Sequence, residues 1–256
     1  MHPYIGITGF RETNEVRRMT EIFEANRPPD SARKLHVGVM TSHKVLFGIP
    51  TRWEKVFPKK GDIAGFFLSD KTYNCLHIAD YARRTDIWMT LIRAIHAGGK
   101  RLHSLQLDMI WPGPDDIRKG IEAVQGENLE IILQIGQGAF EEKGNDPAAV
   151  VRKLEEYKGA IHRVLLDRSM GRGIEMDAAF LLPFIRAIKS RFPQMGIVIA
   201  GGLGPDTLRL TKPVIKEFPE ISIDAQGQLC ECGNLPDRLD SVKCSWYITK
   251  ALELLR

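Results

Sequence analysis

The chain has little cysteine for its 256 residues, and this scarcity excludes one structural class. Its four cysteines, Cys75, Cys230, Cys232 and Cys244, are too few and too unevenly spaced to form a disulfide framework in a chain of this length. We therefore expect reduced thiols. Cys230-Glu-Cys232 offers two metal ligands, but a structural zinc site needs four, and no matching second pair is present. No metal site is expected.

Long apolar runs and an excess of charge are also missing. No run approaches the roughly 18 apolar residues that a membrane span needs, and the N-terminus leads directly into the strand-like segment Tyr4–Thr8. The 36 basic and 32 acidic residues leave a net charge of +4, which is too small and too dispersed to indicate a nucleic-acid partner. We expect a cytoplasmic protein whose partners include neither nucleic acid nor membrane.

Short β-rich apolar runs alternate with longer amphipathic stretches along nearly the whole chain. This alternation predicts a parallel sheet, whose strands read as continuous apolar runs because both faces are buried. The expected strands are Tyr4–Thr8, Leu35–Met40, Cys75–Ala79, Ser104–Leu107, Glu130–Ile135, Arg163–Asp167, Gly196–Ala200 and Ile221–Asp224. The expected helices are Asn14–Ala25, Asp86–Ala97, Pro114–Val124, Asp146–Tyr157, Ala178–Arg191, Asp206–Glu217 and Asp240–Leu255.

The number of strands and the length of the chain favour one α/β domain over residues 1–256. A closed eight-stranded (β/α)8 TIM barrel has about 250 residues, and an open doubly wound sheet is the alternative. No linker or low-complexity tract divides the chain. The segment from His43 to Asp70 interrupts the pattern, and we expect an irregular second helix with a long loop, either a substrate lid or an insertion. Trp53, Phe66 and Phe67 in this segment either mark a subunit contact in a homo-oligomer or pack beneath the loop.

Two glycine-containing turns follow the last two expected strands. The first is Ala200-Gly-Gly-Leu203-Gly204, in which Gly201, Gly202 and Gly204 would let the main chain approach an anion and expose its N–H groups. A helix beginning near Asp206 would direct its positive end to the same place. The second turn is Asp224-Ala-Gln226-Gly227. Phosphate sites in (β/α)8 barrels commonly lie beyond the last two strands, although glycines can also serve only a tight turn.

Acidic side chains stand at the carboxyl ends of four expected strands. Asp80, Asp108, Asp167 and Asp224 follow the third, fourth, sixth and eighth strands, and the other strand ends carry Thr8, Thr41 and Gln134. A carboxylate is expensive to bury without a partner, so such residues are site residues, helix caps or loop anchors. Because a half-desolvated carboxylate can be tuned for proton transfer, we expect Asp167 to act as the acid or base. Asp108 would be its counterpart or would fix a substrate hydroxyl.

Basic residues near the strand ends are candidates for a second anionic group of the ligand. Arg11 follows the first strand, and Arg168 and Arg172 follow the sixth, where a guanidinium could bind such a group with two hydrogen bonds. Solvated loop arginines are the alternative. Of the histidines, His43 is the best catalytic candidate, whereas His77 and His103 are expected to be structural.

Together these motifs resemble phosphoribosylanthranilate isomerase and the wider family of ribulose-phosphate-binding barrels. The likeness lies in Ile7-Thr-Gly9, Val37-Gly-Val39, Leu105-Gln-Leu107, Leu165-Leu-Asp167 with Gly171-Arg-Gly173, and Ala200-Gly-Gly-Leu203. The resemblance implies an Amadori-type isomerisation of a phosphorylated sugar-type substrate without a cofactor, as in tryptophan biosynthesis. It also implies phosphate contacts from Gly201, Gly202, Leu203, Gln226 and Gly227, with Asp167 as the acid.

The chain departs from the family pattern at two catalytic positions. Thr8 stands where the family has its basic cysteine, and Asp108 replaces a histidine. A threonine hydroxyl has no useful basicity near neutral pH, so the reaction would need another base, such as Asp108 or Asp80. Two other functions stay open: a sugar-phosphate lyase or aldolase, which would need a Schiff-base lysine or a metal, and a non-catalytic barrel that binds a phosphorylated metabolite.

Overall fold

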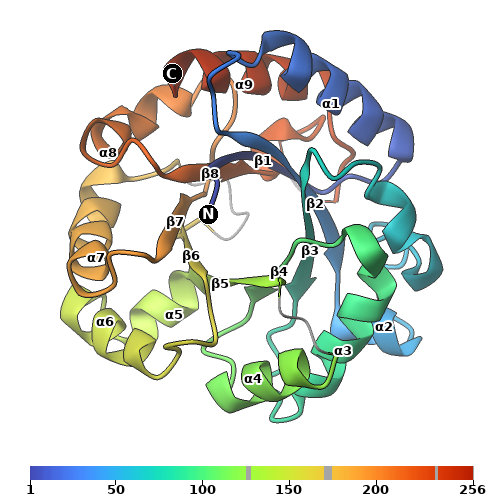
Figure 1. Cartoon of the computed structure of the whole chain (residues 1–256), viewed down its shortest axis with the longest axis vertical. Helices are drawn as coiled ribbons and strands as arrows, with labels where there is room; N and C mark the ends of the chain where they lie inside the picture. The colour runs from blue at the N-terminus through green and yellow to red at the C-terminus, as the bar shows by residue number, and fades with distance from the viewer. Residues whose placement is uncertain (125–127, 170–174, 234–235, 256) are drawn as a thin grey trace.

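The computed structural model describes residues 1–124, 128–169, 175–233 and 236–255, and its eight parallel strands close into one barrel (Figure 1). β1 pairs with β2 on one side and with β8 on the other, so the expected TIM barrel is confirmed and the open sheet is excluded. The expected strands differ from the observed ones only at their ends. The strands are β1 (Tyr4–Thr8), β2 (Lys34–Thr41), β3 (Tyr73–Ala79), β4 (Ser104–Asp108), β5 (Glu130–Gly136), β6 (Arg163–Asp167), β7 (Gly196–Ile199) and β8 (Ser222–Ala225).

Helices form a ring around the strands, as Figure 1 shows. The α-helices are α1 (Thr13–Asn26), α2 (His43–Phe47), α3 (Ile87–Gly98), α4 (Pro114–Glu122), α5 (Gln137–Glu142), α6 (Pro147–Glu155), α7 (Ala178–Arg191), α8 (Lys212–Glu217) and α9 (Ser241–Leu254). Short 3₁₀ helices are η1 (Lys60–Phe66), η2 (Gly99–Arg101), η3 (Leu208–Thr211) and η4 (Gly227–Leu229). The segment from His43 to Asp70 holds α2, a long loop and η1, as expected, whereas α5 was not expected.

The helix expected from Asp206 begins later than predicted. Residues 205–207 form a turn, η3 follows, and α8 starts only at Lys212. The side chain of Thr207 explains the turn, because its Oγ1 accepts a hydrogen bond from Gly204 N at 2.8 Å and donates one to Gly202 O at 2.7 Å. The prediction of a helix N-terminus beside the glycine turn was therefore wrong.

Aspartates begin several helices, but not all of them form a cap. Asp146 accepts hydrogen bonds from the N–H groups of Ala148 and Ala149, as its position before Pro147 predicted. Asp86 precedes α3 without making a side-chain cap bond. Among the described residues, no helix is both long and apolar enough to cross a membrane. The four cysteines are free thiols.

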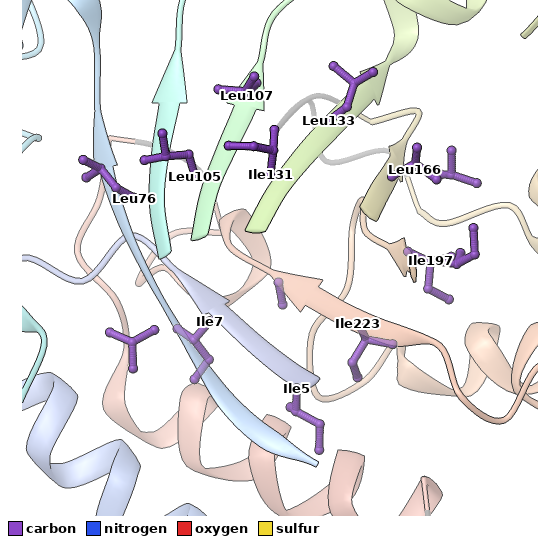
Figure 2. Packing of buried hydrophobic residues seen from close by; sticks show 14 of the residues in the cluster. Ile5, Ile7, Leu76, Leu105, Leu107, Ile131, Leu133, Leu166, Ile197 and Ile223 are labelled. Carbon is purple, nitrogen blue, oxygen red and sulfur yellow. The ribbon is translucent and has the colours of Figure 1, made fainter. Parts of the chain in front are cut away.

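The main hydrophobic core lies between the sheet and the ring of helices. Successive side chains of a strand point to opposite faces, so every second strand residue faces the helices. Ile5 and Ile7 of β1 and Leu105 and Leu107 of β4 are fully buried in this core. Figure 2 shows them with their counterparts from β3, β5, β6, β7 and β8. This buried aliphatic layer packs the helices against the sheet and so fixes the positions from which the loops at both ends of the barrel begin.

The interior of the barrel contains a layer of aromatic and charged residues at the amino ends of the strands. Tyr4 and Tyr73 stack with their ring centroids 5.2 Å apart, and the guanidinium of Arg163 lies 5.4 Å and 5.0 Å from their respective centroids. Arg163 Nε donates to Glu130 Oε2 at 2.6 Å, and Tyr73 OH donates to the same oxygen at 2.6 Å. These contacts fill one end of the barrel, and the open space lies at the other.

Candidate functional site

A cavity of about 420 Å³ opens at the carboxyl ends of the strands. In (β/α)8 enzymes this end of the barrel carries the active site. Residues from β2, β3, β4, β5, β6 and β8 line the cavity together with the loops that follow β2, β3, β6, β7 and β8. Its polar lining includes the carboxylates of Asp108, Asp167 and Asp224. Three of the four acidic strand ends are therefore brought together in one cavity.

Backbone forms the part of the cavity wall that follows β7. Gly201 and Gly202 line the cavity with φ values of 99° and 61°, which glycine adopts without steric cost. A Cβ on Gly201 would come within 2.7 Å of Asp167 Oδ1. Leu203 also lines the cavity although it is almost fully buried. The chain conformation at this turn thus requires glycine and leaves main-chain atoms facing the cavity.

Gly204 does not contribute an available N–H group, contrary to the sequence-based expectation. Its N–H donates to Thr207 Oγ1, and a Cβ at this position would lie 2.8 Å from Cβ of Gln228. Gly204 therefore serves the close packing of the loops that follow β7 and β8. Of the three glycines of this motif, Gly201 and Gly202 border the cavity.

The turn after β8 adds a second stretch of wall beside the first. Gln226 and Gly227 both line the cavity, and Gly227 begins the 3₁₀ helix η4. The side-chain amide of Gln226 lies 2.9 Å from Sδ of Met40 in β2, so this contact reaches past β1, which lies between β8 and β2. The structure thus brings the predicted residues of both turns together.

Asp224 is buried beneath the cavity and is held by Thr8. Thr8 Oγ1 donates to the two carboxylate oxygens at 3.2 Å and 3.0 Å. Burial raises the pKa of Asp224 to about 6, although the charge of His77 and the hydrogen bond from Thr8 act in the opposite direction. Burial therefore favours the protonated form of this carboxyl. Thr8 is not part of the cavity lining, and its hydroxyl is engaged in positioning this carboxylate.

Asp108 is flanked by two side chains of β3 and of the loop after it. The hydroxyl of Tyr81 donates to Asp108 Oδ2, and Nε2 of His77 lies 3.5 Å from the same oxygen. Deeper in the barrel, Gln106 Nε2 donates to Gln134 Oε1 at 2.8 Å. All of these side chains line the cavity. Its floor is thus a continuous polar surface that spans β3, β4 and β5.

Asp167 reaches the cavity, whereas Asp80 is engaged beside it. Asp167 Oδ1 accepts hydrogen bonds from Ser169 N at 2.7 Å and from Ser169 Oγ at 2.8 Å. Asp80 forms an ion pair with Arg84 at 2.9 Å and accepts a hydrogen bond from Ala82 N. Asp80 does not line the cavity, and its place in the structure is that of a loop anchor.

The structure gives different places to the three arginines considered from the sequence. Arg11 donates to the carbonyl oxygens of Pro236 and Asp237, and Arg168 pairs with Asp177 at 3.3 Å and lies over the ring of Phe180. Neither lines the cavity. Arg172 lies outside the described residues. Among the described residues, the arginine that lines the cavity is Arg52, in the loop after α2.

Sequence reasoning missed Arg52 because no strand end precedes it. It belongs to the long loop between α2 and η1, and its guanidinium lies 5.0 Å from the ring centroid of Trp53. Trp53 stacks on Phe57, and all three residues line the cavity. Phe66 and Phe67 are buried in the core, as the alternative of packing beneath the loop predicted. The signal that could have found Arg52 was the length of this loop.

Of the three histidines considered from the sequence, the structure places His77 at the cavity and His43 and His103 away from it. His43 is buried, bonded through Nδ1 to Thr90 Oγ1 at 2.8 Å, and stacked on Phe47. His103 accepts a hydrogen bond from Asn74 N, a structural role that agrees with the prediction. His77 lines the cavity beside Asp108. In the described part of the chain, no group of three or more His, Cys, Asp or Glu side chains is arranged to hold a metal ion.

Comparisons with known proteins establish the fold. A scan against protein-family models gives no match to this chain, and a search of the curated proteins gives none either. Among solved structures, the chain is similar to orotidine 5'-monophosphate decarboxylase from Methanocaldococcus jannaschii complexed with the inhibitor BMP, with a TM-score of 0.60 and 9% identity over 100% of this chain and 99% of the other.

A second similar structure is active domain 2 of a thermostable chitinase from Pyrococcus furiosus, in complex with chito-oligosaccharides. It has a TM-score of 0.59 and 11% identity over 98% of this chain and 94% of the other. Barrels of one fold support many unrelated chemistries, so a likeness at this level of identity concerns the fold alone. The chain is a TIM barrel over its described length.

Proposed function

We propose that the protein binds a phosphorylated sugar-type compound in this cavity and isomerises it by acid–base catalysis of the Amadori type. The observation that carries the proposal is the position of the two glycine turns. Gly201 and Gly202 after β7 and Gly227 after β8 border the same cavity as Asp108 and Asp167. A phosphate held by these turns would place the sugar against the carboxylates.

The wall after β7 and β8 supports phosphate as the anchoring group. Backbone N–H groups in turns with positive φ form concave sites for anions, and glycine lets an anion approach the main chain closely. Gly201 and Gly202 have this conformation. Arg52 brings a positive charge to the same cavity from the loop after α2. A ligand with a phosphate and a second anionic group would engage both.

The carboxylates support proton transfer as the chemistry. In an Amadori rearrangement, an acid protonates the ring oxygen while the bond from C1 to that oxygen breaks, and the amine nitrogen becomes an iminium. A base then removes the proton from C2. We assign the first step to Asp167, whose Oδ1 is fixed by Ser169. Thr8 cannot perform the second step, because its hydroxyl has no useful basicity and donates to Asp224.

Isothermal titration calorimetry tests the binding part of the proposal. The panel consists of inorganic phosphate, ribulose 5-phosphate and a reduced analogue of an amino-deoxyribulose product. We expect Gly202→Asp to weaken binding of the analogue by at least about 100-fold, because a carboxylate would enter the anion site. Gly159→Asp is the matched control, since Gly159 also has a positive φ, 78°, but a Cβ there would meet no heavy atom within 4 Å. Absence of binding by every member of the panel would refute the proposal.

A turnover assay with a phosphoribosylated aromatic amine tests the chemical part. We expect Asp167→Asn to lower kcat by about 100-fold or more while the affinity for the product analogue stays within a few-fold. Equal losses of binding and turnover would instead assign Asp167 an anchoring role. Binding without turnover of any sugar phosphate by the wild type would favour the non-catalytic barrel. A Schiff-base aldolase finds no support, because no lysine lines the cavity among the described residues.

A further inference from the structure

His77 occupies a position in the cavity floor that the proposed chemistry has not used. It lies on β3, next to Gln106 of β4 in the register of the sheet, and its side chain faces the interior of the barrel. Only 5% of the residue is exposed, yet it borders the cavity. The residue is therefore withdrawn from bulk solvent and borders the space in which we place the ligand.

Neither ring nitrogen of His77 makes a hydrogen bond within the described part of the chain. The ring nitrogens of His36 are unpaired too, but His36 does not line the cavity, and two other histidines have hydrogen-bond partners. His103 Nδ1 accepts from Asn74 N, and His162 Nδ1 accepts from Ile131 N at 3.0 Å. Buried polar groups in proteins are nearly always paired, so an unpaired imidazole that borders a cavity points to a ligand.

Acidic groups lie on two sides of the imidazole. Nε2 is 3.5 Å from Asp108 Oδ2 on β4, and Asp224 on β8 is close enough for His77 to lower its pKa. His36 on β2 also interacts with the ring, and burial lowers the pKa of His36 to about 3, which keeps it neutral. The hydroxyl of Tyr81 donates to Asp108 and so holds that carboxylate in place beside the ring. This arrangement orients the imidazole beside the carboxylate of Asp108.

We propose that His77 is the base of the isomerisation, with Asp108 and Tyr81 as its positioning residues. This inference rests on the proposed function. The imidazole takes the proton from C2 of the open-chain iminium, and the electron pair of that bond forms a double bond between C1 and C2. The iminium nitrogen recovers its electron pair. The imidazolium then protonates C1, while the C2 hydroxyl becomes the ketone and returns its proton to Asp167. Both residues regain their starting states, and no atom is gained or lost.

This assignment resolves the missing base of the sequence pattern. Thr8 replaces the cysteine of the family that the chain resembles, and its hydroxyl is engaged with Asp224. Asp80 is paired with Arg84, and Asp108 accepts a hydrogen bond from Tyr81. Of the groups in the cavity floor that can accept a proton, the imidazole of His77 is the one without a hydrogen bond in the described structure.

The test measures turnover and affinity separately in His77→Gln and His77→Ala. We expect kcat for the phosphoribosylated amine to fall at least about 100-fold in both variants, while the dissociation constant of the reduced product analogue stays within about threefold. The binding measurement also shows that each variant is folded. His103→Gln is the matched control, because it removes a histidine of structural role, and it should retain wild-type kcat.

Imidazole added to the solution separates a base from a structural residue. In His77→Ala it should raise kcat at least about tenfold, and in Asp167→Asn it should have no effect. Should His77→Gln turn over at a rate within about fivefold of the wild type, the assignment would be overturned while the proposed function stands. Lack of rescue in a folded, inactive His77→Ala would also overturn it. A wild type that binds the analogue without turnover would overturn both.

Discussion

At the scale of single residues, the cavity is lined by carboxylates that are partly shielded from water. Asp224 is only 5% exposed, and Thr8 is the one described side chain that donates a hydrogen bond to it. Desolvation favours the neutral form and outweighs that hydrogen bond, so the pKa of the carboxyl rises to about 6. Ionisation of Asp224 at this buried position therefore lowers the free energy of unfolding.

Replacing Asp224 by asparagine should therefore stabilise the fold at neutral pH. The pKa rises from 3.8 in the unfolded chain to about 6 in the folded protein, so the folded state binds the proton more tightly. Wild-type stability is then full below pH 3.8 and falls as the pH rises through 6. We expect the free energy of unfolding of Asp224→Asn to exceed that of the wild type by about 2 kcal/mol at pH 8 and to match it near pH 4.

Urea denaturation of both proteins across this pH range measures the difference. Asp206→Asn is the control, because its side chain is 93% exposed, and its difference from the wild type should not change with pH. A difference for Asp224→Asn that is independent of pH would contradict the raised pKa. Catalysis is not needed for this measurement, so it examines the site even if the proposed substrate is wrong.

At the scale of elements, the sequence predicted the strands but not the contacts that their side chains make inside the barrel. Strands buried on both faces appear in the sequence as apolar runs, which is why all eight were found. The partners inside the barrel depend on its closure. Thr8 and Asp224 lie 216 residues apart and meet because β1 pairs with β8. The start of α8 was missed for a local reason, since the hydrogen bonds of Thr207 hold a turn where the pattern indicated a helix.

Candidate site residues were predictable where they follow a strand. Asp108, Asp167, Gly202 and Gly227 border the cavity because parallel strands deliver their carboxyl ends to one face of the barrel. Arg52 was not predictable in this way, because the long loop after α2 folds back over the cavity by contacts that the sequence does not display. The sequence pattern could locate the cavity but could not tell that His77, rather than His43, lines it.

Glycine in β1 gives a prediction at this scale. Gly6 lies between His36 of β2 and Asp224 of β8, and a Cβ there would come within 2.4 Å of Asp224 Oδ1 and 3.0 Å of His36 Nδ1. Gly6→Ala should lower the free energy of unfolding by about 1–3 kcal/mol, as overpacking of a close-packed interior does. Chemical denaturation measures this. Gly65→Ala is the control, because a Cβ there would meet no heavy atom within 4 Å, and it should change the free energy of unfolding by less than about 1 kcal/mol. Equal effects of the two substitutions would contradict the close packing around Gly6.

At the scale of the whole molecule, the barrel has one closed end and one open end. The closed end is held by a network that reaches across the interior. Arg163 of β6 donates to Glu130 of β5 and to the carbonyl of His2 in the N-terminal segment, and Tyr73 of β3 donates to Glu130. The side chain of Arg163 is 3% exposed and that of Glu130 is 23% exposed. The carboxylate of Glu130 thus connects β3, β5 and β6. Its charge should therefore affect the free energy of unfolding of the whole barrel.

Glu130→Gln should destabilise the protein by about 3 kcal/mol at neutral pH, because a buried ion pair that loses one partner leaves an uncompensated charge. The size of the effect should depend on pH. Burial alone would raise the pKa of Glu130, but the hydrogen bond and the charge of Arg163 outweigh burial and hold that pKa below its ordinary value. The carboxylate therefore stabilises the fold above the unfolded pKa of 4.5, and this contribution is lost as the pH falls through the lower folded value.

The free energy of unfolding of the wild type and of Glu130→Gln should be measured at pH 7 and at pH 3. We expect the difference between the two proteins to be smaller at pH 3. Glu155→Gln provides the comparison, since Glu155 pairs with Arg191 at 2.7 Å where both side chains are about half exposed. Exposed ion pairs contribute little, so this variant should lose less than about 1 kcal/mol at either pH. If the two variants behaved alike, the closed end would owe its stability to the stacked rings of Tyr4 and Tyr73 rather than to the ion pair. In that event, replacing Tyr73 would lower the free energy of unfolding more than replacing Glu130 does.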